Sequence, residues 1–192
     1  MWREGDPHVS DARERVLQHL LAHSVRRGDF TLKSGRSSTW FIDSKQTICA
    51  PEVMLDVATL MLERIPPDAT AIGGLTMGAD GAAFITAGVA ATRNRPLRAF
   101  SVRKEVKDHG AGGRIAGSLL ETDRVVITED TVTRGTSLTE AARVVRDVGA
   151  QVVLLLAVVD RGGTAAAMAR DEGWDFDALF SAPDLGFDYE GV

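Results

Sequence analysis

The sequence predicts an α/β fold with a central, mostly parallel sheet flanked by helices. Short apolar runs alternate along the chain with longer amphipathic segments, which is the arrangement of successive βαβ units. The runs occupy residues 70–74, 97–102, 125–127 and 152–159, so we expect four parallel strands. Those at 125–127 and 152–159 are apolar throughout, as strands covered on both faces are.

Composition favours a single cytoplasmic enzyme domain. The 192 residues can bury one core, and 44% of them are apolar. The net charge of −5 argues against general binding to nucleic acid or to a membrane surface. No apolar run approaches the roughly 18 residues that cross a bilayer, and residues 1–6 lack the apolar core of a signal peptide. Cys49 is the only cysteine, which excludes an internal disulfide and a cysteine-based zinc site.

The N-terminal segment predicts a helix. Ser10 can cap it, and it runs to about Val25. His19 and His23 lie on one face of this helix at a spacing that could hold a metal ion. No third ligand is near them in the sequence, so we favour a surface pair.

A hairpin and a second helix follow. Residues 30–32 and 39–42 predict two short strands around a basic turn that contains Lys33. On these residues alone, the turn could bind an anion or could simply be exposed and keep the chain soluble. Residues 50–65 predict an apolar helix with Pro51 in its first turn.

Two glycine-rich segments each follow a predicted strand. After the strand at 70–74, residues 75–81 lead into a helix of small residues at 82–91. Their glycines allow close approach of a ligand, and their N–H groups could bind a phosphate. After the strand at 97–102, residues 103–117 are basic, contain four glycines and lack periodicity. We expect either a mobile lid over an anion site or a solvated surface loop.

The most informative stretch surrounds the third strand. The strand at 125–127 is followed by Glu129 and Asp130, which we expect at the strand end. Residues 131–137 then form a hydroxyl-rich loop that opens an amphipathic helix, and Gly149 closes that helix.

This order of elements indicates a binding site for a ribose 5-phosphate. Free N–H groups and hydroxyls beside the positive end of a helix form a phosphate cradle. Two adjacent carboxylates are costly to bury without a partner, and vicinal hydroxyls or a hydrated Mg²⁺ would provide one. The alternative is a polar turn and a capped helix with no ligand.

The C-terminal region predicts a further candidate binding residue. The strand at 152–159 ends at Asp160 and Arg161, and ligands of open α/β sheets bind at this edge. Arg161 therefore either binds a ligand or forms an ion pair with Asp160. A helix at 164–172 and a short strand at 178–180 follow, and we expect this ending to pack with the N-terminal hairpin as a small hood.

Three stretches resemble a known enzyme family. Residues 127–137, ITEDTVTRGTS, resemble the PRPP-binding motif of type I phosphoribosyltransferases. Residues 30–43, FTLKSGRSSTWFID, and residues 103–110, RKEVKDHG, resemble the orotate phosphoribosyltransferases in particular. The resemblance covers about residues 10–186.

The resemblance implies the type I phosphoribosyltransferase fold as one domain over residues 1–192. The Rossmann-like core would span about 49–174, and the hood about 1–48 and 175–192. The implied reaction joins orotate and PRPP to give orotidine 5'-monophosphate and pyrophosphate, with Mg²⁺, in pyrimidine (UMP) biosynthesis. The family also implies a homodimer in which the basic loop closes over the neighbouring subunit's site.

The same resemblance assigns roles to individual residues. Catalysis would involve Lys107, His109 and Asp130. No protein ligand to the metal is implied, because Mg²⁺ would be held through PRPP and water. Substrate would contact Lys33, Phe41, Ile42, Arg103, Lys104, Glu129, Thr133, Arg134, Gly135, Thr136, Ser137 and Arg161.

This chain departs from the family at a few positions. The loop around Gly78 lacks a lysine that some orotate enzymes carry there, and Gly81 stands where many relatives have proline. Residues 162–163 are glycines where many relatives are acidic. Two alternatives stay open: a phosphoribosyltransferase that acts on uracil or a purine, and a non-catalytic PRPP-binding regulator.

Overall fold

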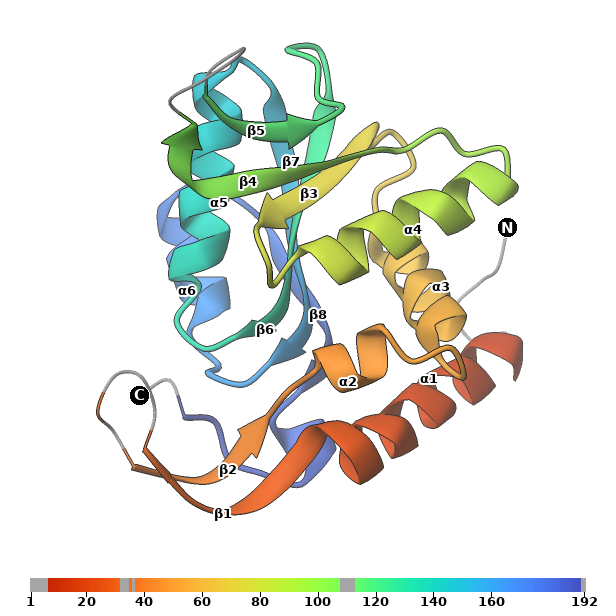
Figure 1. The fold of residues 1–192 in the computed structure, drawn as a ribbon, viewed down its shortest axis with the longest axis vertical. Helices are drawn as coiled ribbons and strands as arrows, with labels where there is room; N and C mark the ends of the chain where they lie inside the picture. The colour runs from red at the N-terminus through yellow and green to blue at the C-terminus, as the bar shows by residue number, and fades with distance from the viewer. Residues whose placement is uncertain (1–6, 32–34, 36, 108–112, 191–192) are drawn as a thin grey trace.

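The computed structural model, which describes residues 7–31, 35, 37–107 and 113–190, confirms the α/β fold. The main sheet has the strand order β5-β4-β3-β6-β7-β8 (Figure 1). Neighbouring strands are parallel except β4 and β5, which are antiparallel. The strands are β3 (Ala71–Leu75), β4 (Arg98–Lys107), β5 (Gly113–Gly117), β6 (Arg124–Val132), β7 (Gln151–Asp160) and β8 (Phe176–Ser181).

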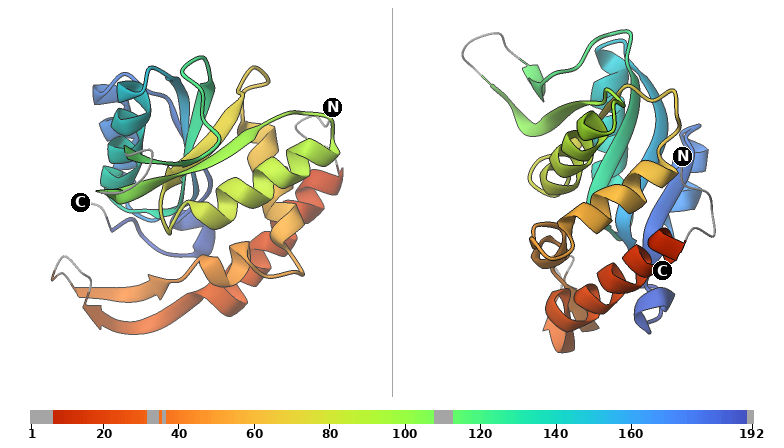
Figure 2. Two further views of the ribbon diagram at one scale, coloured as in Figure 1. Left: turned by 45° about the horizontal axis from the view of Figure 1, so that its top comes forward. Right: turned by 90° about the vertical axis from the view of Figure 1, so that its right-hand side faces the viewer.

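Helices cover both faces of this sheet (Figures 1 and 2). α3 (Met54–Arg64) and α4 (Asp80–Thr92) pack on one face, and α5 (Thr136–Asp147) and α6 (Ala165–Asp171) pack on the other. Successive residues of a strand point to opposite faces. Val126 accordingly packs in the cluster with α3 and α4, while both of its neighbours pack with α5 and α6. Burial on both faces explains the uninterrupted apolar runs in the sequence.

The N-terminal segment forms a separate sheet beyond the carboxyl ends of the parallel strands. α1 (Pro7–His19) continues into a π-helical turn at Leu20–Ser24, and together they confirm the helix predicted there. The prediction that Ser10 caps it is wrong, because the helix begins at Pro7 and Ser10 lies inside it. β1 (Val25–Thr31) and β2 (Ser37–Ile42) form the predicted antiparallel hairpin, with longer strands than expected. Figure 2 shows this hairpin extending away from the main sheet.

The C-terminal segment completes the hood. After β8, a short 3₁₀ turn, η2 (Pro183–Leu185), leads to Phe187, whose ring stacks on Trp40 with centroids 4.3 Å apart. The guanidinium of Arg27 lies 4.4 Å from the centroid of the Phe187 ring. β8 itself lies in the range assigned to the hood from the sequence, yet it pairs in parallel with β7 in the main sheet.

The helix predicted at 50–65 is shorter than expected. It begins at Met54, and residues 51–53 form a turn, so Pro51 precedes the helix instead of lying in its first turn. A separate short helix, α2 (Lys45–Ile48), lies between β2 and this turn and has no clear pattern in the sequence. Its four residues are too few to show helical periodicity.

Residues 103–117 are not a structureless loop where the structure describes them. β4 continues to Lys107 and pairs with β5 through an antiparallel register that includes Lys107 opposite Gly113. Pairing at the sheet edge therefore orders a segment whose glycines and charges predicted a loop, because strand formation depends strongly on neighbouring strands. Residues 108–112 lie outside the described part of the chain.

Within the described ranges, no helix is both long enough and apolar enough to cross a membrane.

Candidate functional site

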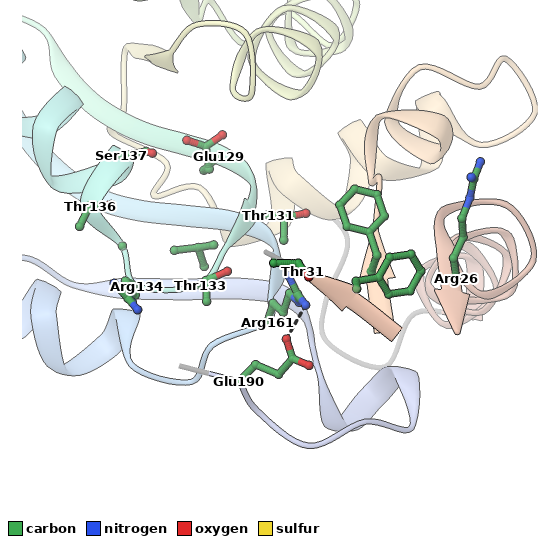
Figure 3. Close-up of a pocket in the computed structure, with 14 residues that line it drawn as sticks. Arg26, Thr31, Glu129, Thr131, Thr133, Arg134, Thr136, Ser137, Arg161 and Glu190 are labelled. Carbon is green, nitrogen blue, oxygen red and sulfur yellow. Dashed lines mark hydrogen bonds and ion pairs between the residues drawn. The ribbon is translucent and has the colours of Figure 1, made fainter. Parts of the chain in front are cut away.

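A cavity of about 740 Å³ lies where the carboxyl ends of β6 and β7 meet the hood (Figure 3). This is the edge at which open α/β sheets bind ligands. The two long strands supply one wall, the hairpin supplies another, and the C-terminal segment closes one side. The lining residues are Arg26, Phe30, Thr31, Phe41, Glu129, Thr131, Val132, Thr133, Arg134, Gly135, Thr136, Ser137, Arg161 and Glu190.

The predicted phosphate loop lines this cavity along its whole length, from Thr133 to Ser137. Gly135 has a φ of +80° and is the N-cap of α5, and no side chain caps that helix. The first turn of α5 therefore presents backbone N–H groups and the positive end of its dipole to the cavity. Gly149 also has a positive φ of +92°, and its N–H bonds to Arg146 O at the other end, which confirms the predicted C-terminal glycine.

A neighbouring segment holds the phosphate loop in shape. The carbonyl oxygen of Thr133 accepts a hydrogen bond from Thr164 Oγ1 at 3.1 Å. The backbone of Gly162 lies so close to that carbonyl that a Cβ at position 162 would be 1.6 Å from the oxygen. Glycine is therefore required there by close packing of two backbone segments.

Glu129 and Asp130 are both buried and lie within β6, which continues to Val132 instead of ending before them. Asp130 pairs with Lys45 and accepts a hydrogen bond from Ser44 Oγ at 3.0 Å. Lys45 was not predicted as a site residue. Its only signal in the sequence is that lysine is scarce beside arginine in this chain.

The pKa of Glu129 lies far above its ordinary value. Burial, together with the hydrogen bond and charge of Asp130, raises the pKa of Glu129 to about 9. The Glu129 carboxylate also packs over Gly78, where a Cβ would lie 1.8 Å from Oε1. The glycine-rich segment after β3 thus meets the acidic pair, which brings two separately predicted motifs together.

Arg161 is buried at the end of β7 and its guanidinium is heavily engaged. Nη2 donates to Ser38 Oγ and to the Trp40 carbonyl, each at 2.9 Å, and forms an ion pair with Glu190. Burial lowers the pKa of Arg161, and the charge of Glu190 opposes that effect. The alternative partner, Asp160, instead accepts hydrogen bonds from backbone N–H groups just after Arg161.

Glu190 was missed from the sequence. It is 29 positions from Arg161, and no local pattern marks an acidic residue in a C-terminal segment as part of a site. The contact exists because the chain folds back over the hood.

The remaining predicted residues divide into three groups. Phe41 lines the cavity, whereas the Ile42 side chain is buried in the core beside it. Arg103 and Lys104 lie on β4, away from the cavity lining, and Arg103 approaches the carbonyl of Ile115 at 3.5 Å. Lys33, His109 and the side chain of Lys107 lie outside the described residues.

The histidine pair on the N-terminal helix is close but isolated from other ligands. The His19 and His23 ring centroids are 4.3 Å apart, and His19 Nδ1 is 3.0 Å from Thr47 Oγ1. Burial, and then the charge of His23, lowers the pKa of His19. Among the described residues, no group of three or more His, Cys, Asp or Glu side chains could hold a metal ion.

Comparison with known proteins gives consistent results, although no family model matches the chain. It is 36% identical over 183 residues to an orotate phosphoribosyltransferase from Nostoc, covering 95% of this chain and 89% of that protein. It is 35% identical to the Streptomyces avermitilis orotate phosphoribosyltransferase, covering 94% of this chain and 100% of the relative.

Solved structures agree with these relatives. The Mycobacterium tuberculosis orotate phosphoribosyltransferase in complex with Fe(III) dicitrate matches with a TM-score of 0.79 and 34% identity, over 92% of this chain and 99% of that one. The same enzyme in complex with PRPP matches with a TM-score of 0.75 and 33% identity, over the same shares of the two chains.

Proposed function

This chain belongs to the orotate phosphoribosyltransferase family, and we propose that it transfers the 5-phosphoribosyl group from PRPP to orotate. The products are orotidine 5'-monophosphate and pyrophosphate, and the reaction belongs to pyrimidine biosynthesis. The enzyme is a pentosyltransferase. One observation carries this function: the phosphate loop, Glu129 and Arg161 all line the same cavity. Asp130 follows Glu129 directly in β6.

The PRPP half of the cavity supports binding of a phosphorylated ribose. The loop from Thr133 to Ser137 offers hydroxyls and helix-terminal N–H groups to the 5'-phosphate. Glu129 lines the cavity, and we propose that it and the adjacent Asp130 hold the ribose hydroxyls. The negative charge of the pair, which Asp130 carries while Glu129 is protonated, would also stabilise the cation-like ribosyl centre that forms as pyrophosphate departs.

The base half supports an anionic acceptor. Arg161 lies at the edge of the cavity, and the Phe41 and Phe30 rings, with centroids 5.8 Å apart, provide an apolar surface for a flat base. Orotate is already anionic, so the reaction needs no side-chain nucleophile. Positioning and electrostatics supply the catalysis.

The metal is proposed to arrive with the substrate. Mg²⁺ prefers oxygen ligands and commonly combines one or two carboxylates with substrate phosphates and water. In this site PRPP oxygens and water would hold the ion without a ligand from the protein, because Asp130 is already paired with Lys45 and Glu129 is protonated at neutral pH. Mg²⁺ would neutralise charge on the pyrophosphate as it leaves.

A cytoplasmic homodimer is the proposed assembly. Arg103 and Lys104 do not line the cavity of their own chain, which supports a basic hairpin that serves a neighbouring subunit. Large apolar side chains are exposed on or beside α3 and α4, with Leu55 60%, Met77 74% and Phe84 48% exposed. A dimer interface would cover them. Size-exclusion chromatography coupled to light scattering tests this, since Phe84→Ser should shift the mass toward that of a monomer.

The reaction is tested by mixing the protein with PRPP and Mg²⁺ and following orotate consumption by absorbance. Uracil, adenine and hypoxanthine serve as parallel acceptors. Consumption of orotate alone supports the proposal. Turnover of another base would still support the proposed PRPP site but would contradict the proposed base site. PRPP binding without turnover of any base would indicate a regulator.

The lid is tested by Lys107→Ala. We expect kcat to fall far more than PRPP binding weakens, because the lysine would neutralise the departing pyrophosphate only as charge develops. An unchanged kcat would remove the lid from the mechanism.

A further inference from the structure

The base site contains a carboxylate that belongs to the protein. Glu190 lines the cavity and reaches Arg161 from the C-terminal segment (Figure 3). Its Oε2 pairs with Arg161 Nη2, and its Oε1 accepts a hydrogen bond from Ser38 Oγ. The backbone N–H of Glu190 also donates to Arg161 O at 3.1 Å.

The C-terminal segment that carries Glu190 is held in place by packing against the surrounding structure. The Tyr189 ring lies over Gly163, where a Cβ would be 2.6 Å from the ring. Phe187 stacks on Trp40, and the Trp40 ring in turn lies 4.8 Å from the Arg161 guanidinium carbon. The position of Glu190 therefore follows from specific packing along the segment that precedes it.

A carboxylate in this position conflicts with an anionic substrate. The Arg161 side chain is only 7% exposed, so it needs a counter-ion in the free protein. Glu190 meets that need, keeps 19% of its side chain exposed and is one of the residues that line the cavity. An anionic base that approached the same guanidinium would be repelled by Glu190 unless the side chain moved away.

We infer that Glu190 is an internal ligand of the base site that occupies Arg161 in the free enzyme and that the anionic base displaces. This inference rests on the proposed function, because it takes Arg161 to be the residue that binds the base. It adds a base-site residue whose effect is on affinity for the acceptor alone. Removing the Glu190 charge should then tighten binding of orotate and leave PRPP unaffected.

The test compares Glu190→Gln with Asp188→Asn by initial-rate kinetics. Both substitutions remove one carboxylate from the same segment, but Asp188 is exposed and does not line the cavity. For Glu190→Gln we expect the KM for orotate to fall about threefold or more, with the KM for PRPP within twofold of wild type. Asp188→Asn should match wild type for both substrates. An unchanged or raised orotate KM in Glu190→Gln would overturn the inference and make Glu190 a support for Arg161.

A structure of the wild-type protein with orotate gives an independent answer if the variant does not fold. Glu190 beyond hydrogen-bonding distance of Arg161 supports displacement, and an intact pair with bound orotate contradicts it. The kinetics also separate this inference from the proposed function. A wild-type protein that does not consume orotate contradicts the function, whereas an active wild type with an unaltered Glu190→Gln variant contradicts only the inference.

Discussion

The two halves of the cavity are built in different ways. The half proposed to bind PRPP, called the phosphate half below, comes from one continuous segment, in which β6, the loop to α5 and the first turn of that helix follow one another in the chain. The half proposed to bind the base, called the base half below, is assembled around Arg161 from β2, the end of β7 and the C-terminal segment. The first uses mainly backbone groups, and the second uses side chains.

This difference predicts how each half responds to mutation. Backbone groups cannot be removed one at a time, so the phosphate half is sensitive to changes in chain path. The base half depends on individual charged contacts, so single side-chain changes should alter acceptor binding without affecting PRPP. The following predictions test that separation, from the largest expected effect to the smallest.

Gly162→Ala should have the largest effect and should act on PRPP. The added Cβ would lie 1.6 Å from the Thr133 carbonyl oxygen, so the phosphate loop must move. A displacement of about 1 Å can cost about 100-fold in kcat/KM. Steady-state kinetics with varied PRPP measure this. Gly88→Ala is the control because it lies in α4 with nothing within 4 Å of the new Cβ; an equal loss in both variants would contradict the explanation.

Arg161→Met should act on the base half alone. Loss of a charged hydrogen-bonding partner costs about 2 kcal/mol, or about 30-fold in affinity. We expect the KM for orotate to rise by about that factor while the KM for PRPP stays near wild type. A parallel rise in both constants would show that the two halves are not separable. Thermal denaturation should accompany the kinetics, because Glu190 loses its counter-ion in this variant.

Lys45→Met should weaken the phosphate half through the acidic pair. Lys45 pairs with Asp130 and helps to lower the pKa of the neighbouring Glu129. Without this cation, Glu129 holds its proton to higher pH, and we expect the KM for PRPP to rise about fivefold near pH 7. The rise should shrink as the pH approaches 9.5. An orotate KM that changed instead would place Lys45 in the other half.

Glu129→Gln should have its clearest effect on stability. The folded-state pKa is about 9 against an ordinary value of 4.5, so the folded protein binds a proton that the unfolded chain lacks between these values. Stability therefore falls as the pH rises through this window. The glutamine variant should not lose stability in this way, so it should be more stable than wild type at pH 8. Near pH 4.5 it should have no such advantage over wild type.

Urea denaturation between pH 4.5 and pH 9 measures this difference. Glu121→Gln is the matched control because that side chain is exposed. A constant difference between Glu129→Gln and wild type across the range would show that Glu129 is not protonated in the folded protein.

Sequence reasoning predicted the phosphate half well because its contacts are local. The buried strand, the acidic pair, the hydroxyl-rich loop and the closing Gly149 all lie within one βα unit, so their order fixes their arrangement. It placed the end of β6 too early at Glu129, because polar residues that are buried against a neighbouring segment look like a strand end. Asp130 is an example, since Lys45 and Ser44 satisfy it.

The partner of Arg161 and the pairing of β4 with β5 were decided by the tertiary structure. Arg161 was identified from its place at a strand end, but its partner was not, because Glu190 meets it only when the C-terminal segment packs across Trp40 and Gly163. The pairing of β4 with β5 likewise overrode a local composition typical of a loop. Local patterns specify which backbone groups and side chains a segment offers. Which charges neutralise one another depends on packing between segments far apart in the chain.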